Sequence, residues 1–169
     1  NITNGSPDSL FTGIKHSYPF HPSLRDLYAR FKENQGFQQT RGLIRLMRAV
    51  VADIFSSEAS AEKYMISPFD VNLNKSEIFT QVVNIKPSLS NAISHDIASQ
   101  GTAVAENIDK NYKTEIAQEF SKLVLISSLA DIPNALLGLT QSEIVENLCE
   151  PNKDLTVLKT VMQEYSLRA

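Results

Sequence analysis

The 169-residue chain contains a single cysteine, Cys149, and no apolar run longer than four residues. One cysteine cannot form an intramolecular disulfide or a cysteine-based metal site, which fits a reducing compartment and favours a cytoplasmic protein. Runs of four apolar residues are far shorter than the roughly 20 that cross a bilayer. These absences argue against a membrane-spanning protein and a disulfide-stabilised scaffold.

The common catalytic motifs are also missing. The six glycines fit neither the P-loop pattern GxxxxGK[ST] nor the dinucleotide pattern GxGxxG. His16, His21 and His95 lack the i, i+4 pairing of a helical zinc site, and the sequence has no HExxH or CxxC motif, so no metal is expected. No GxSxG motif marks a nucleophilic serine, and we predict that Cys149 is a buried or half-buried, unreactive thiol. We assign no catalytic residue.

The composition is that of an ordinary globular domain. Apolar residues make up 42% and charged residues 21% of the chain, which argues against a disordered or collagen-like protein. The net charge of −3 gives no overall attraction to nucleic acid, so contact with DNA would need a local basic patch. The chain starts at Asn1 without a methionine or a signal segment, and we expect it to be a piece of a longer protein.

Apolar residues recur at intervals of three and four along most of the chain, which predicts a mainly α-helical fold. Residues 24–31 form the first expected helix, with Pro22 in its first turn and Gly36 as its end. The strongest prediction is a second helix over residues 43–55, with Thr40 as its N-cap.

Further helices are predicted in the rest of the chain. Thr140 and Glu143 form a capping box, a strong N-terminal signal for the helix that follows. Residues 123–126 are all apolar, so we expect this part of the helix predicted at 116–127 to be buried on every side. The other expected helices are 78–83, capped by Asn74 with Glu77 and ended by Pro87; 89–97, ended by Gly101; 116–127; and 155–165, capped by Asp154.

We predict a helical bundle followed by a three-helix unit of the helix-turn-helix or winged-helix kind. A three-helix bundle that does not bind DNA fits the last helices equally well. The predicted divisions are a disordered or extended segment at 1–13, a helical subdomain at 14–70, a helical connector at 71–110, and a winged-helix-like, possibly truncated subdomain at 111–169.

Three arginines in the second predicted helix are the main candidate for function. Arg41, Arg45 and Arg48 are spaced by four and three residues, so they share one side of the helix. With Thr40 as the cap, Arg41 lies in the first turn, where a cation opposes the helix dipole at a cost of about 0.3–1 kcal/mol. A phosphate would relieve that cost and suits arginine donors at a helix N-terminus. The spacing also fits a solvated face that pairs with nearby acidic groups.

Two sequence blocks carry a family resemblance, YPFHP at 18–22 and FQQTRGLIRL at 37–46. They resemble the "YPFHP … FQ-TRG-LRLL" signature of large AAA+-type ATPases found in bacterial and archaeal defence islands, a family still labelled as a domain of unknown function. Weaker similarity continues through residues 105–109 and 123–129 and into a later GLTxxE element. The resemblance covers most of the chain, and its first part is the specific one.

In AAA+ proteins a helical lid carries a GxxR sensor-2 motif, whose arginine contacts the terminal phosphate of the nucleotide. Gly42 to Arg45 match this motif, so the resemblance implies that the helical bundle at 14–70 is a lid-like subdomain. The resemblance implies that Arg45 stabilises charge on the transferred phosphoryl group, with Arg41 or Arg48 in accessory phosphate or subunit contacts. Which of the three is the sensor stays open.

The remaining motif positions are assigned to structure. Pro19 and Pro22 stiffen the approach to the first helix, and we expect the imidazole of His21 to hydrogen-bond locally rather than transfer protons. Gly42, the glycine of the GxxR motif, is also assigned a structural role.

The resemblance implies a piece of a putative ATPase that supplies a sensor arginine and a partner-docking surface. ATP and Mg²⁺ would be bound only in the full-length parent, because the P-loop lysine, the magnesium-binding acidic strand and the sensor-1 residue lie outside this chain. The expected partner is the parent's N-terminal nucleotide-binding domain, and an oligomer of the parent is compatible with this reading. The chain alone is not expected to hydrolyse ATP.

Two other functions remain open. One is a nucleic-acid or protein-interaction helical module with no nucleotide link, and the other is a purely structural scaffold. Direct DNA reading by the last helix is disfavoured because its outer face mixes charges, and any wing strands would have to follow Ala169. The residues on that face are Asp154, Lys159, Gln163, Glu164 and Arg168.

Overall fold

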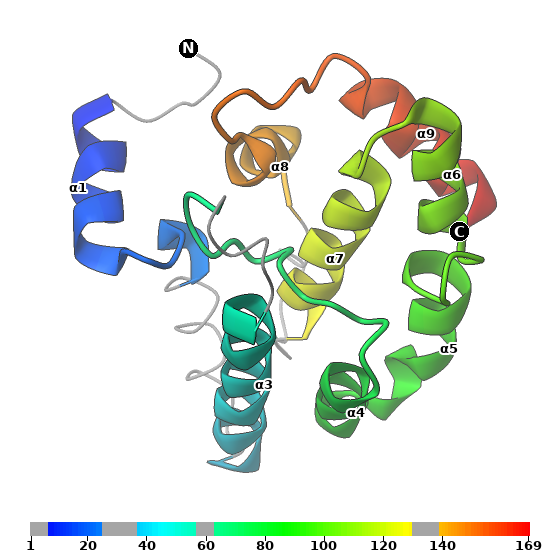
Figure 1. Ribbon diagram of the computed structural model, residues 1–169, viewed down its shortest axis with the longest axis horizontal. Coiled ribbons are helices and arrows are strands. Elements are labelled where there is room, and N and C mark those ends of the chain that lie inside the picture. The colour runs from blue at the N-terminus through cyan, green and yellow to red at the C-terminus, as the bar shows by residue number, and fades with distance from the viewer. Residues whose placement is uncertain (1–6, 25–36, 57–62, 130–138) are drawn as a thin grey trace.

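A computed structural model describes residues 7–24, 37–56, 63–129 and 139–169 of the chain (Figure 1). Within these ranges the chain is helical and has no strand, apart from one isolated bridge between Phe20 and Ile66, so the predicted mainly α-helical class is confirmed. The elements are α1 (Pro7–Ser17), α3 (Phe37–Ser56), α4 (Ser76–Ile85), η2 (Pro87–Leu89), α5 (Ser90–Ala92), η3 (Ile93–Ile97, a π-helical turn), α6 (Val104–Tyr112), α7 (Ile116–Ser128), α8 (Gln141–Leu148) and α9 (Leu158–Arg168).

Helix α1 corrects the prediction of a disordered or extended segment at 1–13 for residues 7–13, which are helical, while residues 1–6 lie outside the described part of the chain. Proline suits the first helical turn, and Asp8 there complements the helix dipole. The hydroxyl of Thr12 donates to the carbonyl oxygen of Asp8 at 2.8 Å, a local hydrogen bond that threonine side chains form within helices. Of the helix predicted at 24–31, only Leu24 lies among the described residues.

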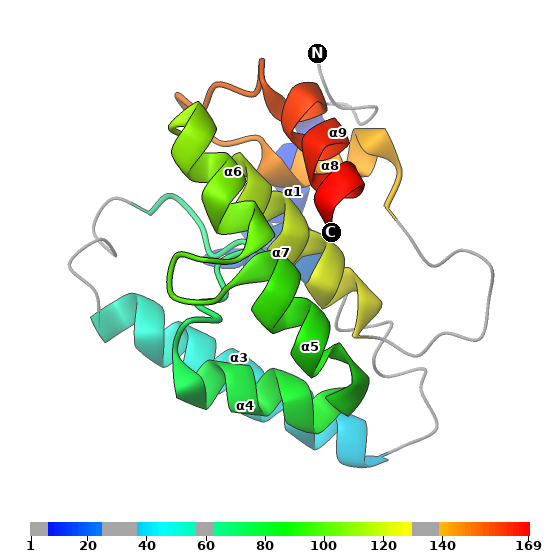
Figure 2. The same ribbon diagram turned by 90° about the vertical axis from the view of Figure 1, so that its right-hand side faces the viewer.

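Helices α3 and α4 form an antiparallel pair at one end of the molecule (Figure 2). Near the end of α4, Ile85 lies against Gly42 in the first half of α3, whereas Lys75, just before α4, pairs with Asp53 near the end of α3. Contacts at both ends fix the direction and register of the pair. Leu46, Val50, Ile78 and Val82 are buried between these helices and the rest of the core.

Among the described residues, the core has two hydrophobic clusters, and α7 connects them. Leu123 belongs to the cluster with α6, α8 and α9, while Leu125 and Ile126 belong to the cluster with α3 and α4. Helix α7 crosses the middle of the molecule in Figure 1. The expected burial of residues 123–126 holds for these three, but Val124 is 42% exposed.

Residues 63–75, which are largely non-helical, run through the centre of the molecule. Ile66 and Val71 are buried in the α3–α4 cluster, and Phe69 between them is buried in the other. The packing therefore places the boundary predicted near residue 70 inside the core rather than in an exposed linker.

Three predicted caps have different outcomes. The capping box of α8 is confirmed, since Thr140 accepts from the backbone N–H of Glu143 at 3.2 Å and Glu143 accepts from that of Thr140 at 2.7 Å. Asn74 does not cap α4, whose N-cap is Lys75. Asp154 accepts from the N–H of Thr156 at 2.9 Å, a turn that precedes α9 instead of capping it, and the N-cap of α9 is Val157.

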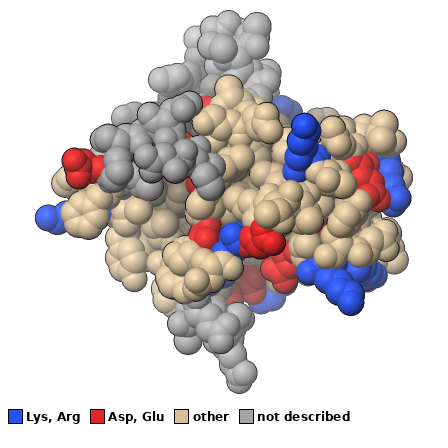
Figure 3. All heavy atoms as spheres, turned by 90° about the horizontal axis from the view of Figure 1, so that it is seen from above, with Lys and Arg blue, Asp and Glu red and all other residues tan. Residues whose placement is uncertain are grey.

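The C-terminal helices pack around α7, which contacts α6, α8 and α9, and α9 also packs on α6. The apolar face predicted for the last helix lies in this cluster, with Leu158 and Val161 buried. The face seen from above in Figure 3 intersperses acidic and basic side chains among uncharged ones, so its described part lacks the one-sign basic field typical of DNA-binding surfaces. None of the described helices is both long and apolar enough to cross a membrane.

Candidate functional site

The arginine-bearing helix starts earlier than its sequence predicts. Helix α3 begins at Phe37, so Thr40 lies inside the first turn and is not the N-cap. Arg41 is therefore in the second turn, where the helix dipole exerts little effect, and the predicted conflict between Arg41 and the dipole does not arise. A phosphate site at this helix N-terminus loses that support, and the three side chains have to be judged by their exposure.

Arg41, Arg45 and Arg48 are all exposed and lie on the side of α3 that faces away from the core. Among the described residues, Arg45 and Arg48 take part in no ion pair, so the alternative of a face neutralised by nearby acids is not seen for these two. Arg41 does have an interaction partner. Two guanidinium groups one helical turn apart are thus available to an anion.

Gly42 has a packing role on the adjacent side of α3. A Cβ atom at this position would lie 3.1 Å from Cγ1 of Ile85, closer than ordinary van der Waals contact. The glycine therefore lets α3 approach α4 closely, and Arg45 projects from the helix one turn later. The GxxR motif combines a helix-packing glycine with an exposed arginine.

Exposed apolar side chains flank the arginines. Ile44 is 52% exposed and Phe55 is 67% exposed, and both lie on the outer side of α3 with Ala52 between them. We call Arg41, Ile44, Arg45, Arg48, Ala52 and Phe55 together the α3 surface.

The YPFHP segment is tied to the core through His21, whereas Tyr18 at its start is 68% exposed. His21 is buried, and its backbone N–H donates to the carbonyl oxygen of Ile66 at 2.9 Å, while the N–H of Ile66 donates to the carbonyl oxygen of Pro19 at 2.8 Å. Nδ1 of His21 lies 2.6 Å from Oγ of Ser23, a local hydrogen bond. Burial lowers the pKa of His21, and the charge of Glu150 partly opposes this. Pro22 begins the short helical segment that contains Ser23.

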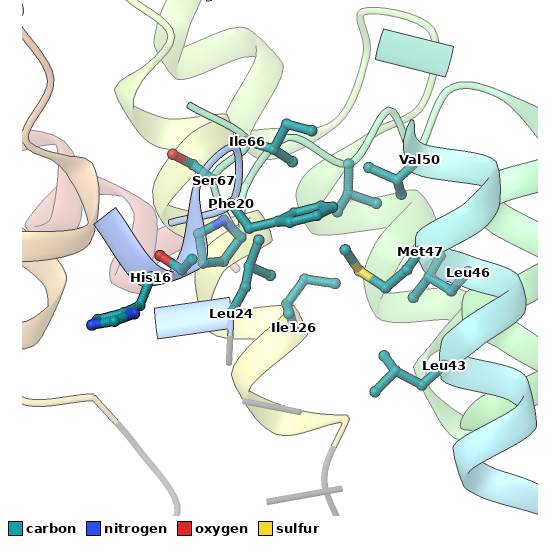
Figure 4. A pocket seen from close by; sticks show the side chains of 13 residues that line it. His16, Phe20, Leu24, Leu43, Leu46, Met47, Val50, Ile66, Ser67 and Ile126 are labelled. Carbon is teal, nitrogen blue, oxygen red and sulfur yellow. The ribbon is translucent and has the colours of Figure 1, made fainter. Parts of the chain in front are cut away.

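An apolar cavity of about 360 Å³ lies between the YPFHP segment and α3. Phe20, Leu24 and Met47 point into the same space in Figure 4, with Ile126 of α7 at its base. His16 stands at the edge and is exposed. The volume falls within the range of small-molecule pockets, but the lining has few polar groups that could orient a substrate.

A group of charged side chains joins α7 to the loop between α8 and α9. Nζ of Lys153 lies 2.5 Å from Oε2 of Glu119 and 3.3 Å from Oε2 of Glu150, and 4.7 Å above the ring of Phe69. Burial raises the pKa of Glu119 to about 7, although the hydrogen bond and charge of Lys153 oppose this. Burial also lowers the pKa of Lys122 on the same helix. Strongly shifted groups occur at catalytic sites and in structural ion-pair networks alike.

The carboxylate of Glu106 holds the turn before α6. It accepts hydrogen bonds from the backbone N–H groups of Ser99, Gly101 and Ala103 at 2.8–3.0 Å and from Nδ2 of Asn74 at 2.8 Å. Burial raises the pKa of Glu106, but these four hydrogen bonds outweigh it and lower the pKa overall. Gly101 adopts a positive φ of 92° in this turn, a conformation that favours glycine.

Asp109, one turn later, caps the next helix from outside. Its carboxylate accepts from the backbone N–H groups of Ala117 at 2.8 Å and Gln118 at 3.0 Å, in the first turn of α7. Burial raises the pKa of Asp109 against these hydrogen bonds. Both acids lie within residues 105–109, a stretch for which the sequence alone predicted no role. The sequence signal that could have identified them was an acidic residue among the apolar positions of a helix.

The remaining candidates give no site. Cys149 is exposed, contrary to the prediction of a buried or half-buried thiol, and lies just beyond the end of α8 as its extended C-cap residue. In the part of the chain that the structure describes, no cluster of three or more histidine, cysteine or acidic side chains could hold a metal ion. The exposed arginines of α3 remain the best candidate for ligand contact.

Comparison with protein families gives a match over most of the chain. Residues 4–156 match the model described as "DUF499 second domain". Comparisons with curated proteins and with solved structures give no match. The matched range includes the YPFHP segment, the α3 surface and both buried carboxylates of α6. Because the match covers most of its length, the chain belongs to the DUF499 second-domain family.

Proposed function

We propose that this chain is the helical lid-like part of a larger AAA+-type ATPase and presents Arg45 to the terminal phosphate of a nucleotide bound by another domain. The observation that carries the proposal is that Arg45 is exposed and lies one turn beyond Gly42, whose close contact with Ile85 fixes α3 on α4. The family name, which speaks of a second domain, supports a parent that contains at least one other domain.

Arginine suits this task because its guanidinium is permanently charged and can donate two parallel hydrogen bonds to a phosphate. Stabilising the charge that develops on the transferred phosphoryl group requires donors that are positioned in advance. Helix α3 gives Arg45 such a position, since Leu43 and Leu46 on either side of it are buried in the core. Arg48 is the accessory contact in this proposal.

ATP and Mg²⁺ belong to the other domain of the parent. This chain contains no P-loop sequence, and its contribution is the arginine and the rigid helix pair that carries it. A movement of α3 and α4 as one body would bring Arg45 toward the nucleotide or take it away.

Steady-state ATP turnover by the full-length parent tests this proposal. We expect Arg45→Ala to lower kcat by about 100-fold, which is typical of removing one donor to a developing anion. Arg48→Ala is expected to have a smaller effect, and Lys159→Ala, an exposed change on α9, serves as the control. Turnover by Arg45→Ala at the wild-type rate would rule out the sensor assignment.

The second candidate function is a protein-interaction module without a nucleotide link. The exposed side chains of Ile44 and Phe55 favour this function, because a surface that binds only phosphate has no use for apolar side chains. In that case Arg45→Ala would weaken binding of the partner while leaving ATP turnover unchanged.

A further inference from the structure

We propose that Glu119, Glu150 and Lys153 form a pH-sensitive attachment between α7 and the connection that joins α8 to α9, residues 149–157. The attachment holds the connection closed on α7 and weakens as the pH rises through neutrality. We call these three side chains the Lys153 cluster. The proposal concerns the C-terminal helices and does not depend on the role of Arg45.

The Lys153 cluster is the polar link between the connection and α7. Nζ of Lys153 lies 2.5 Å from Oε2 of Glu119 on α7. The other hydrogen bonds found in the connection are local: the backbone N–H of Lys153 donates to the carbonyl oxygen of Glu150 at 3.2 Å, and that of Thr156 donates to the carboxylate of Asp154 at 2.9 Å. Among the described residues, the attachment of this stretch to α7 therefore depends on apolar packing and on Lys153 with Glu119.

The cluster places one ammonium between two carboxylates in a site with little water. The side chain of Lys153 is 16% exposed, that of Glu119 13% and that of Glu150 29%. The ring of Phe69, 4.7 Å from Nζ, covers one side of the ammonium. One ammonium cannot neutralise both carboxylates, so a proton on one of them removes the excess negative charge. Glu119 is the less exposed of the two and is the one that binds the proton.

Protonation of Glu119 favours the closed arrangement. Burial raises its pKa to about 7, and the charges of Glu150 and Glu115 act in the same direction, against Lys153. When the connection moves away, water reaches Glu119 and its pKa returns toward the ordinary 4.5. The closed arrangement therefore binds the proton more tightly, so its advantage is greatest below pH 4.5 and is lost as the pH rises to about 7. Above that pH, the cost of keeping ionised Glu119 from water exceeds the attraction of Lys153.

Other charged groups lie near the cluster on neighbouring elements. They are Glu115 and Lys122 on α7, Asp70 in residues 63–75, Asp109 on α6 and His21 in the YPFHP segment. Three acids on the other helices that contact α7 are engaged elsewhere: Glu143 in the capping box of α8, Glu164 with Arg168 in α9, and Asp96 with His95 in η3.

The direction of the pH effect distinguishes Glu119 from its basic neighbours. Burial lowers the pKa of Lys122 and of His21, so both bind a proton more weakly in the closed arrangement. Their titration would strengthen the attachment as the pH rises, whereas that of Glu119 weakens it.

Thiol alkylation of the chain carrying Leu155→Cys tests the proposal. Leu155 is half-buried in the connection, and the exposed native Cys149 is the reference in the same molecule, which corrects for the effect of pH on thiol ionisation. The pKa values of about 7 and 4.5 give about a tenfold rise in the opening equilibrium between pH 6 and pH 8. We expect the rate at Leu155→Cys, divided by the rate at Cys149, to rise by the same factor. Peptide mass spectrometry measures the two rates separately.

The same measurement on cluster variants assigns the effect to Glu119. Glu119→Gln keeps the shape of the side chain but cannot ionise, so the rate ratio should change by less than about twofold. Glu77→Gln, exposed on α4, is the matched control and should keep the full rise. Lys153→Met removes the ammonium that favours ionised Glu119, so the midpoint of the rise should move to higher pH.

Four results would overturn the proposal. Two are an equal rise with Glu119→Gln and without it, and a rate ratio that falls as the pH rises. The third is a midpoint that Lys153→Met leaves unchanged. The fourth is a Leu155→Cys thiol that reacts as fast as Cys149 already at pH 6, since the connection would then not be held on α7.

A second thiol separates opening of the connection from unfolding of the whole chain. Val82→Cys places a thiol in the cluster buried with α3 and α4, where it reacts only when that cluster opens. We expect the Leu155→Cys thiol to react at least about tenfold faster than the Val82→Cys thiol at pH 8, because the connection opens while α3 and α4 stay folded. Equal rates at these two positions would show that the chain unfolds as one unit and would also contradict the proposal.

Discussion

At the scale of single residues, buried carboxylates show how the same side-chain type takes opposite pKa shifts. Four hydrogen bonds lower the pKa of Glu106 in spite of its burial, whereas burial prevails at Glu119 and raises its pKa to about 7. Glu119 has the single ammonium of Lys153 close to it, and that ammonium is shared with Glu150. The balance between burial and hydrogen bonding decides the direction, since burial also prevails at Asp109 in spite of the hydrogen bonds to its carboxylate.

The raised pKa of Glu119 predicts that the free energy of unfolding depends on pH. Its pKa is about 7 in the folded chain against an ordinary value of 4.5, so the folded state binds the proton more tightly than the unfolded state. The contribution of Glu119 to the free energy of unfolding is therefore greatest below pH 4.5 and falls as the pH rises to about 7. Glu119→Gln should remove this fall, which urea unfolding at pH 5 and pH 8 measures.

Glu77→Gln, at an exposed position on α4, is the matched control and should leave the wild-type pH dependence in place. If Glu119→Gln and the wild-type chain lose the same stability between pH 5 and pH 8, the role given to Glu119 is wrong.

At the scale of helices, Gly42 links packing and function. A larger side chain there meets Ile85, so we expect Gly42→Leu to cost about 1–3 kcal/mol of unfolding free energy by overpacking the α3–α4 contact. Combining it with Ile85→Ala should cost less than the sum of the single changes, because each change relieves the other.

Urea unfolding of the two single variants and the double variant measures this coupling. Ala52→Leu, an exposed change on the same helix, should alter stability by less than about 0.5 kcal/mol. Strict additivity of Gly42→Leu and Ile85→Ala would show that the two residues do not determine the approach of α3 to α4.

The connection between α6 and α7 depends on the side chain of Asp109. Asp109→Ala leaves the first-turn N–H groups of Ala117 and Gln118 without their acceptor, and we expect a loss of about 1–3 kcal/mol in unfolding free energy. Asp109→Asn keeps one acceptor oxygen and should lose less. Chemical denaturation measures both, and equal stability of the alanine variant and the wild-type chain would contradict the capping role.

Helix prediction succeeded where signals are local. The Thr140–Glu143 box and the apolar spacing of α7 both lie within a few residues, and both are found as predicted. Helix prediction failed where a side chain binds a residue that is distant in the sequence. Asn74 has the right spacing to cap α4, yet it contacts Glu106, 32 residues away. The start of α3 at Phe37 was missed because Thr40, a frequent N-cap residue, lies in its first turn.

At the scale of the whole molecule, the two hydrophobic clusters could not be predicted from periodicity. Residues 66–73 have no helical pattern, so they resembled a boundary, but Ile66, Phe69 and Val71 are buried in the core. Which stretch of non-helical chain passes between helices depends on tertiary packing alone. The site was predictable in part: spacing placed three arginines on one side of α3, but the exposure of Ile44 and Phe55 beside them required the structure.

The central claim is that α3 presents Arg45 to a nucleotide held by another part of the protein. The most direct test compares ATP turnover of the full-length parent carrying Arg45→Lys, Arg45→Ala or the remote Lys159→Ala. The account predicts the wild-type rate for Lys159→Ala and the lowest kcat for Arg45→Ala. Arg45→Lys should have an intermediate kcat, because lysine keeps the positive charge but lacks the planar guanidinium that donates two parallel hydrogen bonds. Wild-type kcat in both Arg45 variants would contradict it.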